Sequence, residues 1–286
     1  MSQTLLMILA VPVGLLAGSY ATMLVDRMQD DTPLSVRSRC PNCGGPLGLL
    51  DTLPVLSWVR LGGQCRECGE RITPAYPAVE LVTMALFVFV AYRYHQTDWL
   101  IIVPLILVVA LVSLSTIDLY VYRLPNRLVF ASLGLSLVAM AVLAVADLRD
   151  PAVLLGPLLA GLGYSAFLFV FWLVYPPGMG FGDVKLALLL GAHTGWVGYV
   201  YYDDWVAVVQ ITFWALFVGT LAGVVFSIAM LLIRKFGDRN ALADPEAEVD
   251  ADGNPVETRV RKSAFPFGPS LAIGTFVMVM YPHWAL

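Results

Sequence analysis

The stretch WLIIVPLILVVALVSLSTI, Trp99–Ile117, contains no charged residue. A helix of about 20 such residues rises about 30 Å, the thickness of the hydrocarbon core of a bilayer. Similar runs recur along the 286-residue chain, which is 59% apolar and 13% charged, with a mean hydropathy of +0.78. This composition lies outside the range of soluble globular domains and predicts an all-α polytopic membrane protein.

The apolar runs together predict about eight transmembrane helices. The clear candidates are Leu5–Val25, Trp99–Ile117, Leu128–Ala146, Pro151–Gly182, Trp205–Ile233 and Ala264–Leu286. Two weaker candidates join them: Pro77–Tyr94 holds two charged residues, and Leu186–Tyr202 is short. The first run is interpreted as a helix and not as a secretory signal, because no basic residue precedes it and no clear cleavage site follows.

Lysine and arginine are distributed unevenly over the predicted loops. When alternate loops are assigned to opposite faces, 15 of the 17 basic residues fall on one face and only Arg93 and Arg149 on the other. Cytoplasmic loops carry the excess of basic residues in membrane proteins. The sequence therefore predicts a multi-pass protein whose N-terminus lies outside.

Two of the predicted cytoplasmic loops are long and differ in composition. Residues 26–76 are polar and carry all four cysteines, so they are expected to fold as a small cysteine domain. Residues 237–263 are acidic and almost free of apolar side chains, as expected of a linker. A first helix at 1–25, a transmembrane core at 77–236 and a last helix at 264–286 complete the predicted organisation.

The four cysteines form two CxxC pairs, Cys40 with Cys43 and Cys65 with Cys68, and a glycine follows each pair. Such pairs suit a tetrahedral zinc ion, because glycine lets the turn adopt positive φ. Two disulfides are the alternative, but thiols stay reduced in the cytoplasm, where the charge count places the loop. Zinc bound by four cysteines has no open coordination position, so its predicted role is structural.

Three acidic residues, Glu80, Asp118 and Asp183, lie near predicted helix ends on the cytoplasmic side. Asp118 closes the third helix and Asp183 opens the sixth, at the same depth. Two facing carboxylates can share one proton, so that one activates water while the other polarises a peptide carbonyl, as in aspartyl proteolysis. Each also has a structural alternative: Asp183 as the N-cap of its helix, and Asp118 as a helix-end acid paired with Arg123.

Several segments resemble those of the type IV prepilin peptidases, a family of GxGD-type intramembrane aspartyl proteases. Besides the Asp118 segment and the cysteine pairs, these segments are GSYATMLVDR (Gly18–Arg27), RSRCPNCGGPL (Arg37–Leu47), LPVLSW (Leu53–Trp58), YPAVEL (Tyr76–Leu81), GFGDVKL (Gly180–Leu186) and FPFGPSLAIG (Phe265–Gly274). They occur in the order of the family and span nearly the whole chain.

The resemblance implies that Asp118 and Asp183 are the catalytic aspartates of an enzyme of the bacterial inner membrane. It implies cleavage of the leader peptide of type IV prepilins or type II secretion pseudopilins after a glycine, at the cytoplasmic face. It also implies methylation of the new N-terminus by S-adenosylmethionine, an activity linked to the position of Glu80. The implied partners are these protein substrates and the lipid bilayer, and no nucleic acid is expected.

Two other classes of function are compatible with the residue pattern. A membrane transporter can use paired acids at a broken helix, but its site lies near the bilayer centre, whereas Asp118 and Asp183 abut the charged loops. A pilus or secretion assembly scaffold would use the zinc-stabilised loop for docking and the aspartates only as helix caps. Cleavage of a prepilin peptide by the purified protein separates the protease from both alternatives.

Overall fold

A computed structural model describes residues 2–29, 32–33, 36–121, 124–148, 150–176, 179–236 and 267–285. The predicted linker at 237–263 lies outside the described residues, and so does Arg123, the partner considered for Asp118.

The described residues form helices and turns, with two isolated β-bridges and no strand. The long helices are α1 (Gln3–Gln29), α3 (Ala75–Arg93), α4 (Ile102–Val121), α5 (Asn126–Ala146), α6 (Leu155–Val174), α7 (Phe181–Tyr202), α8 (Trp205–Phe236) and α9 (Gly268–Met280). The short ones are α2 (Leu56–Arg60), η1 (Leu49–Asp51), η2 (Asp98–Ile101), η3 (Pro151–Leu154) and η5 (Pro282–Trp284).

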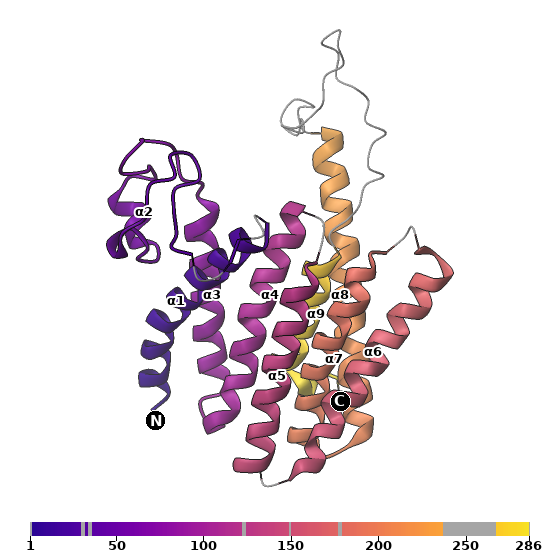
Figure 1. The fold of residues 1–286 in the computed structure, drawn as a ribbon. Helices are drawn as coiled ribbons and strands as arrows, with labels where there is room; N and C mark the ends of the chain where they lie inside the picture. Colours follow the sequence, from indigo (N-terminus) through magenta and orange to yellow (C-terminus); the bar gives the residue numbers. More distant parts are fainter. Residues whose placement is uncertain are drawn as a thin grey trace.

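Six helical segments among the described residues are long and apolar enough to cross a membrane. They are Gln3–Met28, Ala75–Arg93, Trp99–Val121, Asn126–Ala146, Pro151–Val174 and Trp205–Ala229. The two remaining long helices, α7 and α9, lie among the others in the bundle (Figure 1). The prediction of an all-α polytopic membrane protein with about eight helices is confirmed.

The apolar run Pro151–Gly182 extends past the helix that it contains. Helix α6 ends at Val174, and α7 begins at Phe181. An apolar run records hydrophobicity and not backbone conformation, so it does not mark the residue at which α6 ends. The last helix is also shorter than predicted, because α9 covers only Gly268–Met280.

Helices α6 and α7 pack with their backbones in contact. A Cβ atom on Gly195 would lie 2.3 Å from the carbonyl oxygen of Gly156, and one on Gly191 would lie 2.5 Å from the carbonyl oxygen of Ala160. Small residues allow this close approach of membrane helices. The two helices therefore form one closely packed pair.

The bundle has two sides joined by a central helix. Helix α1 packs on α3 at one edge, α6 packs on α7 and α8 on α9 at the other, and α4 contacts both α1 and α9 (Figure 1). The cysteine domain lies beyond α1 and α3, at the end of the bundle where α4 ends (Figure 1). The same end carries the last turn of α4 and the first turns of α7 and α9.

Candidate active site and cysteine centre

Asp118 lies in the last turn of α4 and is only 6% exposed. Its Oδ2 atom accepts a 3.0 Å hydrogen bond from the backbone N–H of Gly268, the first residue of α9. A helix N-terminus favours a negative charge, since its first N–H groups have no partner within the helix. A Cβ atom on Gly268 would lie 2.7 Å from the same oxygen, so a larger residue there would displace the carboxylate.

Asp183 lies in the first turn of α7 and is also 6% exposed. Its backbone N–H donates a 3.1 Å hydrogen bond to the carbonyl oxygen of Gly180. The N-cap of α7 is Gly180, so the alternative that Asp183 serves as the N-cap is wrong. Asp183 is thus the third residue of α7, and N-capping does not explain why an acidic side chain is present there.

The structure brings the two predicted aspartates together. Asp118 and Asp183 are close enough to interact electrostatically. The segments that carry them are also in contact, because a Cβ atom on Gly182 would lie 3.1 Å from Cβ of Leu124. Glycine at position 182 therefore lets the start of α7 approach the segment that follows α4.

Lys185, two residues after Asp183, points to the same neighbouring segment. Its Nζ atom donates a 2.7 Å hydrogen bond to Oδ1 of Asn126 and lies 4.8 Å from the ring centre of Phe181. The ammonium group thus joins the start of α7 to the start of α5. This contact adds a second link between the start of α7 and the chain that follows α4.

Two neighbours of the aspartates were not predicted from sequence. The first is Gly268, and the only sequence signal for it is its place in the FPFGPSLAIG segment. The second is Tyr164 of α6, which is buried, interacts electrostatically with Asp183 and has no hydrogen-bond partner for its hydroxyl among the described residues. Nothing in the apolar run around Tyr164 distinguishes it from a tyrosine that packs in a membrane bundle.

Glu80 contacts a different part of the protein, namely Val55 and Gly18. It is a buried residue of α3, and its Oε2 atom accepts a 2.7 Å hydrogen bond from the backbone N–H of Val55 in the cysteine domain. Val55 has φ of 59°, a left-handed conformation that a β-branched residue rarely adopts. On the other side, a Cβ atom on Gly18 of α1 would lie 2.6 Å from Cα of Glu80. Glu80 is therefore positioned where α1, α3 and the cysteine domain meet.

The four cysteines gather as predicted. The sulfur atoms of Cys40, Cys43, Cys65 and Cys68 all lie within 4.8 Å of one another, and all four cysteines are free thiols. The two sulfurs of Cys40 and Cys68 are 3.9 Å apart. A tetrahedral zinc ion with bonds of about 2.3 Å separates its sulfur ligands by about 3.8 Å, so this cluster has the dimensions of a metal site.

Each cysteine pair forms the same tight turn. The N–H of Gly44 donates to the carbonyl oxygen of Cys40, and the N–H of Gly69 donates to that of Cys65, at 2.9 and 3.0 Å. Both glycines have positive φ, 70° and 72°. The backbone N–H groups of Cys43 and Asn42 lower the pKa of the Cys40 thiol to about 7. The backbone N–H of Gly45 lowers the pKa of the Cys43 thiol, but burial and the neighbouring sulfur atoms outweigh it and raise this pKa to about 12.

Two family models and several named relatives match this chain. A family model described as Type IV leader peptidase family matches residues 105–232, and one described as Bacterial Peptidase A24 N-terminal domain matches residues 13–94. A Pseudomonas aeruginosa protein named prepilin leader peptidase/N-methyltransferase is 32% identical over 248 residues, which cover 85% of this chain and 71% of the relative. The chain belongs to the type IV leader peptidase family.

Other relatives match the type IV leader peptidase chain over more of its length. Proteins with the same printed name from Aeromonas salmonicida and Myxococcus xanthus are 29% and 27% identical, over 92% and 95% of this chain and 78% and 89% of the relatives. No solved structure matches. The leader peptidase match contains Asp118 and Asp183, and the N-terminal match contains Glu80 and the four cysteines.

Proposed function

We propose that this membrane peptidase removes the leader peptide of type IV prepilins or type II secretion pseudopilins by cutting after a glycine. Asp118 and Asp183 are the catalytic pair in this proposal. The observation that carries it is a pair of buried carboxylates, on α4 and α7, that are close enough to interact electrostatically, one of them accepting a hydrogen bond from the first residue of α9. Paired acids that share a proton are the working parts of an aspartyl protease.

The contacts of the two aspartates support different roles for them, with Asp118 as the general base and Asp183 as the general acid. Asp118, which accepts the N–H of Gly268, acts as the base that takes a proton from water. The resulting hydroxide attacks the carbonyl carbon of the leader's last glycine, while the proton on Asp183 passes to the carbonyl oxygen. The tetrahedral intermediate then collapses and the C–N bond breaks. The proton held by Asp118 passes to the leaving amine, and one hydroxyl of the intermediate returns its proton to Asp183 as the new carboxyl group forms.

The proposed orientation has the N-terminus outside and the catalytic pair at the cytoplasmic face of a bacterial inner membrane. The cysteine domain lies at the same end of the bundle as the aspartates (Figure 1), and it carries five exposed arginines: Arg37, Arg39, Arg60, Arg66 and Arg71. Basic residues mark the cytoplasmic side of membrane proteins. The domain boundaries predicted from the sequence, at 25/26, 76/77, 236/237 and 263/264, belong to the same proposal.

The metal proposed for the cysteine cluster is zinc. Four thiolates at tetrahedral spacing are the ligand set that zinc prefers, and they leave no position for a substrate. The ion's role is to hold the two turns together, while the chemistry takes place in the membrane bundle.

Methylation of the new N-terminus is proposed as a second activity, because the relatives carry N-methyltransferase in their names. S-adenosylmethionine would supply the methyl group. A hollow of about 510 Å³ in the cysteine domain, lined in part by Trp58, Gln64 and Arg71, is the place that we propose for the adenosyl group. Glu80 would serve this activity through its bond to Val55, by fixing the cysteine domain on α3.

Cleavage by purified protein tests the principal proposal. The substrate is a prepilin with its leader, mixed with the full chain in lipid nanodiscs and followed by mass spectrometry. Asp118→Asn and Asp183→Asn should each abolish cleavage, while Asp147→Asn, an exposed aspartate at the end of α5, should cleave as the unmodified chain does. Cleavage retained in both site variants would rule the pair out.

The position of the aspartates also bears on the alternative functions. Asp118 ends α4 and Asp183 begins α7, so neither carboxylate lies at mid-bundle, where a transport site is expected. An assembly scaffold predicts no cleavage by any variant. The same assay therefore distinguishes the peptidase from both alternatives.

A further inference from the structure

The cysteine domain exposes five aliphatic side chains that are close together in sequence and are here called the apolar face. Leu49, Leu50, Leu53, Leu56 and Val59 are 89%, 58%, 40%, 67% and 64% exposed. They lie on η1, on α2 and on the turn between these two short helices. A soluble domain of this size rarely leaves so many adjacent aliphatic side chains uncovered, so this face is expected to contact an apolar environment.

The location of this face identifies the environment within its reach. Figure 1 shows α2 at the periphery of the molecule, beyond α1 and α3, at the height where α4 ends. Because α4 spans the membrane, its end marks the boundary between hydrocarbon and headgroups. Helix α2 therefore lies beside the bundle at the depth of the membrane interface.

Two contacts hold the face at that depth. Glu80 of the membrane helix α3 accepts the N–H of Val55, which directly precedes α2. The indole Nε1 of Trp58 donates a 3.1 Å hydrogen bond to the carbonyl oxygen of Ile72, which fixes α2 on the rest of the domain. Both polar contacts join α2 to the protein, whereas Leu56 and Val59 of the same helix are exposed.

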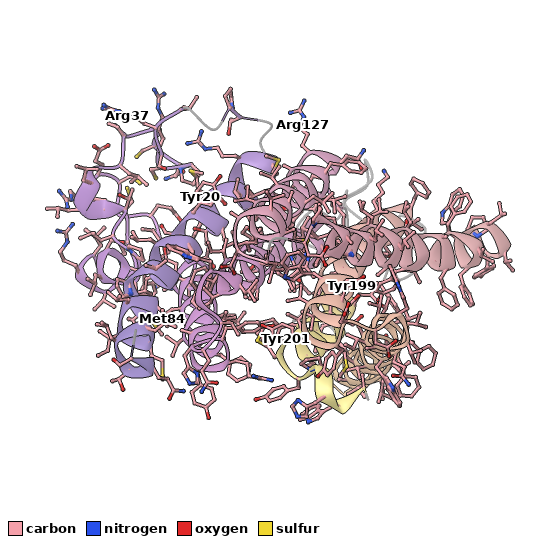
Figure 2. The ribbon with its side chains drawn as sticks, turned by 90° about the horizontal axis from the view of Figure 1, so that it is seen from below. Tyr20, Arg37, Met84, Arg127, Tyr199 and Tyr201 are labelled. Atoms are coloured by element: carbon pink, nitrogen blue, oxygen red, sulfur yellow. The ribbon has the colours of Figure 1, made fainter. Side chains whose placement is uncertain are left out.

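The charges of the cysteine domain favour contact with an anionic surface. Asp51, the acidic residue within the segment, is bound by Arg60 and Arg66, and its side chain is only 10% exposed. Arg37, Arg39 and Arg71 are exposed on the same domain, and Figure 2 shows Arg37 at its outer edge, directed away from the helices. The described part of the domain, 36–74, holds five arginines against three acidic residues.

We propose that Leu49, Leu50, Leu53, Leu56 and Val59 form a membrane-surface anchor that inserts into the headgroup region of an anionic leaflet. Aliphatic side chains enter the boundary between headgroups and acyl chains, and the neighbouring arginines bind lipid phosphates. The occupant of this face is thus the lipid surface itself. The anchor fixes the orientation of the cysteine domain on the bilayer independently of catalysis.

Photo-crosslinking of the full chain in nanodiscs tests this anchor. A diazirine amino acid replaces Leu50 or Leu56, and mass spectrometry identifies the adducts after irradiation. Glu70, an exposed residue outside the apolar face, is the negative control position, and Leu9, an exposed residue of the membrane helix α1, is the positive control position. Unchanged zinc content of each variant shows that the cysteine domain is folded.

We expect lipid adducts at positions 50 and 56, as at position 9, and none at position 70. Replacing phosphatidylglycerol by phosphatidylcholine should lower the yield at positions 50 and 56 by about fivefold for each arginine that binds lipid, and leave position 9 unchanged. Water adducts alone at positions 50 and 56, or adducts only to a second copy of the chain or to added prepilin, would overturn the proposal. Cleavage of prepilin is measured on the same samples, so failure of the anchor is distinguishable from failure of the peptidase.

Discussion

The backbone N–H of Gly268 donates to Oδ2 of Asp118 at 3.0 Å, although the two residues are 150 positions apart in sequence. A side chain at position 268 would collide with the oxygen that accepts this bond. The contact places the start of α9 in the candidate active site, beyond the residues 105–232 that match the leader peptidase family. Gly268 is therefore a positioning residue for Asp118.

Gly268→Ala should lower kcat for prepilin cleavage by roughly 100-fold, because displacing a catalytic group by about 1 Å has effects of that size. KM should change little, since no substrate contact is removed. Gly134→Ala is the matched control, as a Cβ atom there has no neighbour within 4 Å. Equal kcat values for the two variants would show that the contact with Asp118 is dispensable.

Glu80→Ala should loosen the cysteine domain from α3. The variant leaves the N–H of Val55 without its acceptor, at a cost of about 1–3 kcal/mol. Hydrogen exchange at residues 53–58 should become faster, while Glu80→Gln, which keeps an acceptor oxygen, should stay close to the unmodified chain. Prepilin cleavage should persist in both variants, and unchanged exchange in Glu80→Ala would contradict the proposed docking role.

Metal analysis of the purified chain should find about one zinc ion per molecule, as expected for a site with four cysteine ligands. Cys40→Ala should remove the zinc, whereas Thr52→Ala, an exposed neighbour in the same domain, should retain it. Thiolates bind protons in competition with the metal, so zinc should be released as the pH falls. A metal-free chain prepared without chelators would disprove the zinc site.

Gly195→Ala should destabilise the bundle, because a methyl group there would meet the carbonyl oxygen of Gly156 at 2.3 Å. Overpacking of this kind costs about 1–3 kcal/mol. Gly163→Ala lies on the neighbouring helix with no atom within 4 Å of its Cβ and should be neutral or stabilising. Thermal unfolding in nanodiscs measures both variants, and the opposite order of stabilities would refute the close packing of α6 and α7.

The sequence was sufficient to single out Asp118 and Asp183 as candidate site residues and the four cysteines as a candidate metal site. A charged residue next to an apolar run is costly and stands out, and paired CxxC motifs have few uses besides metal binding. The approach of the two aspartates could be inferred from their common depth. Their catalytic role stays a prediction that the proposed variants test.

Contacts between distant segments could not be predicted in the same way. No local pattern shows that the N-terminus of α9 meets Asp118, or that Glu80 binds the backbone of Val55. The left-handed conformation of Val55 is also hidden, because a β-branched residue gives no sequence signal for positive φ. These features depend on how complete helices pack, which a hydropathy pattern does not encode.

The backbone contact between α6 and α7 limits the route by which a substrate helix reaches the site. These two helices cannot separate without breaking their closest packing, so they are expected to move as one rigid body that carries Asp183. Asp118 belongs to α4, outside that body. Binding of a prepilin helix is thus expected to increase the distance between α4 and the α6–α7 pair. The scissile bond would then lie between the two aspartates when α4 and the pair approach each other again.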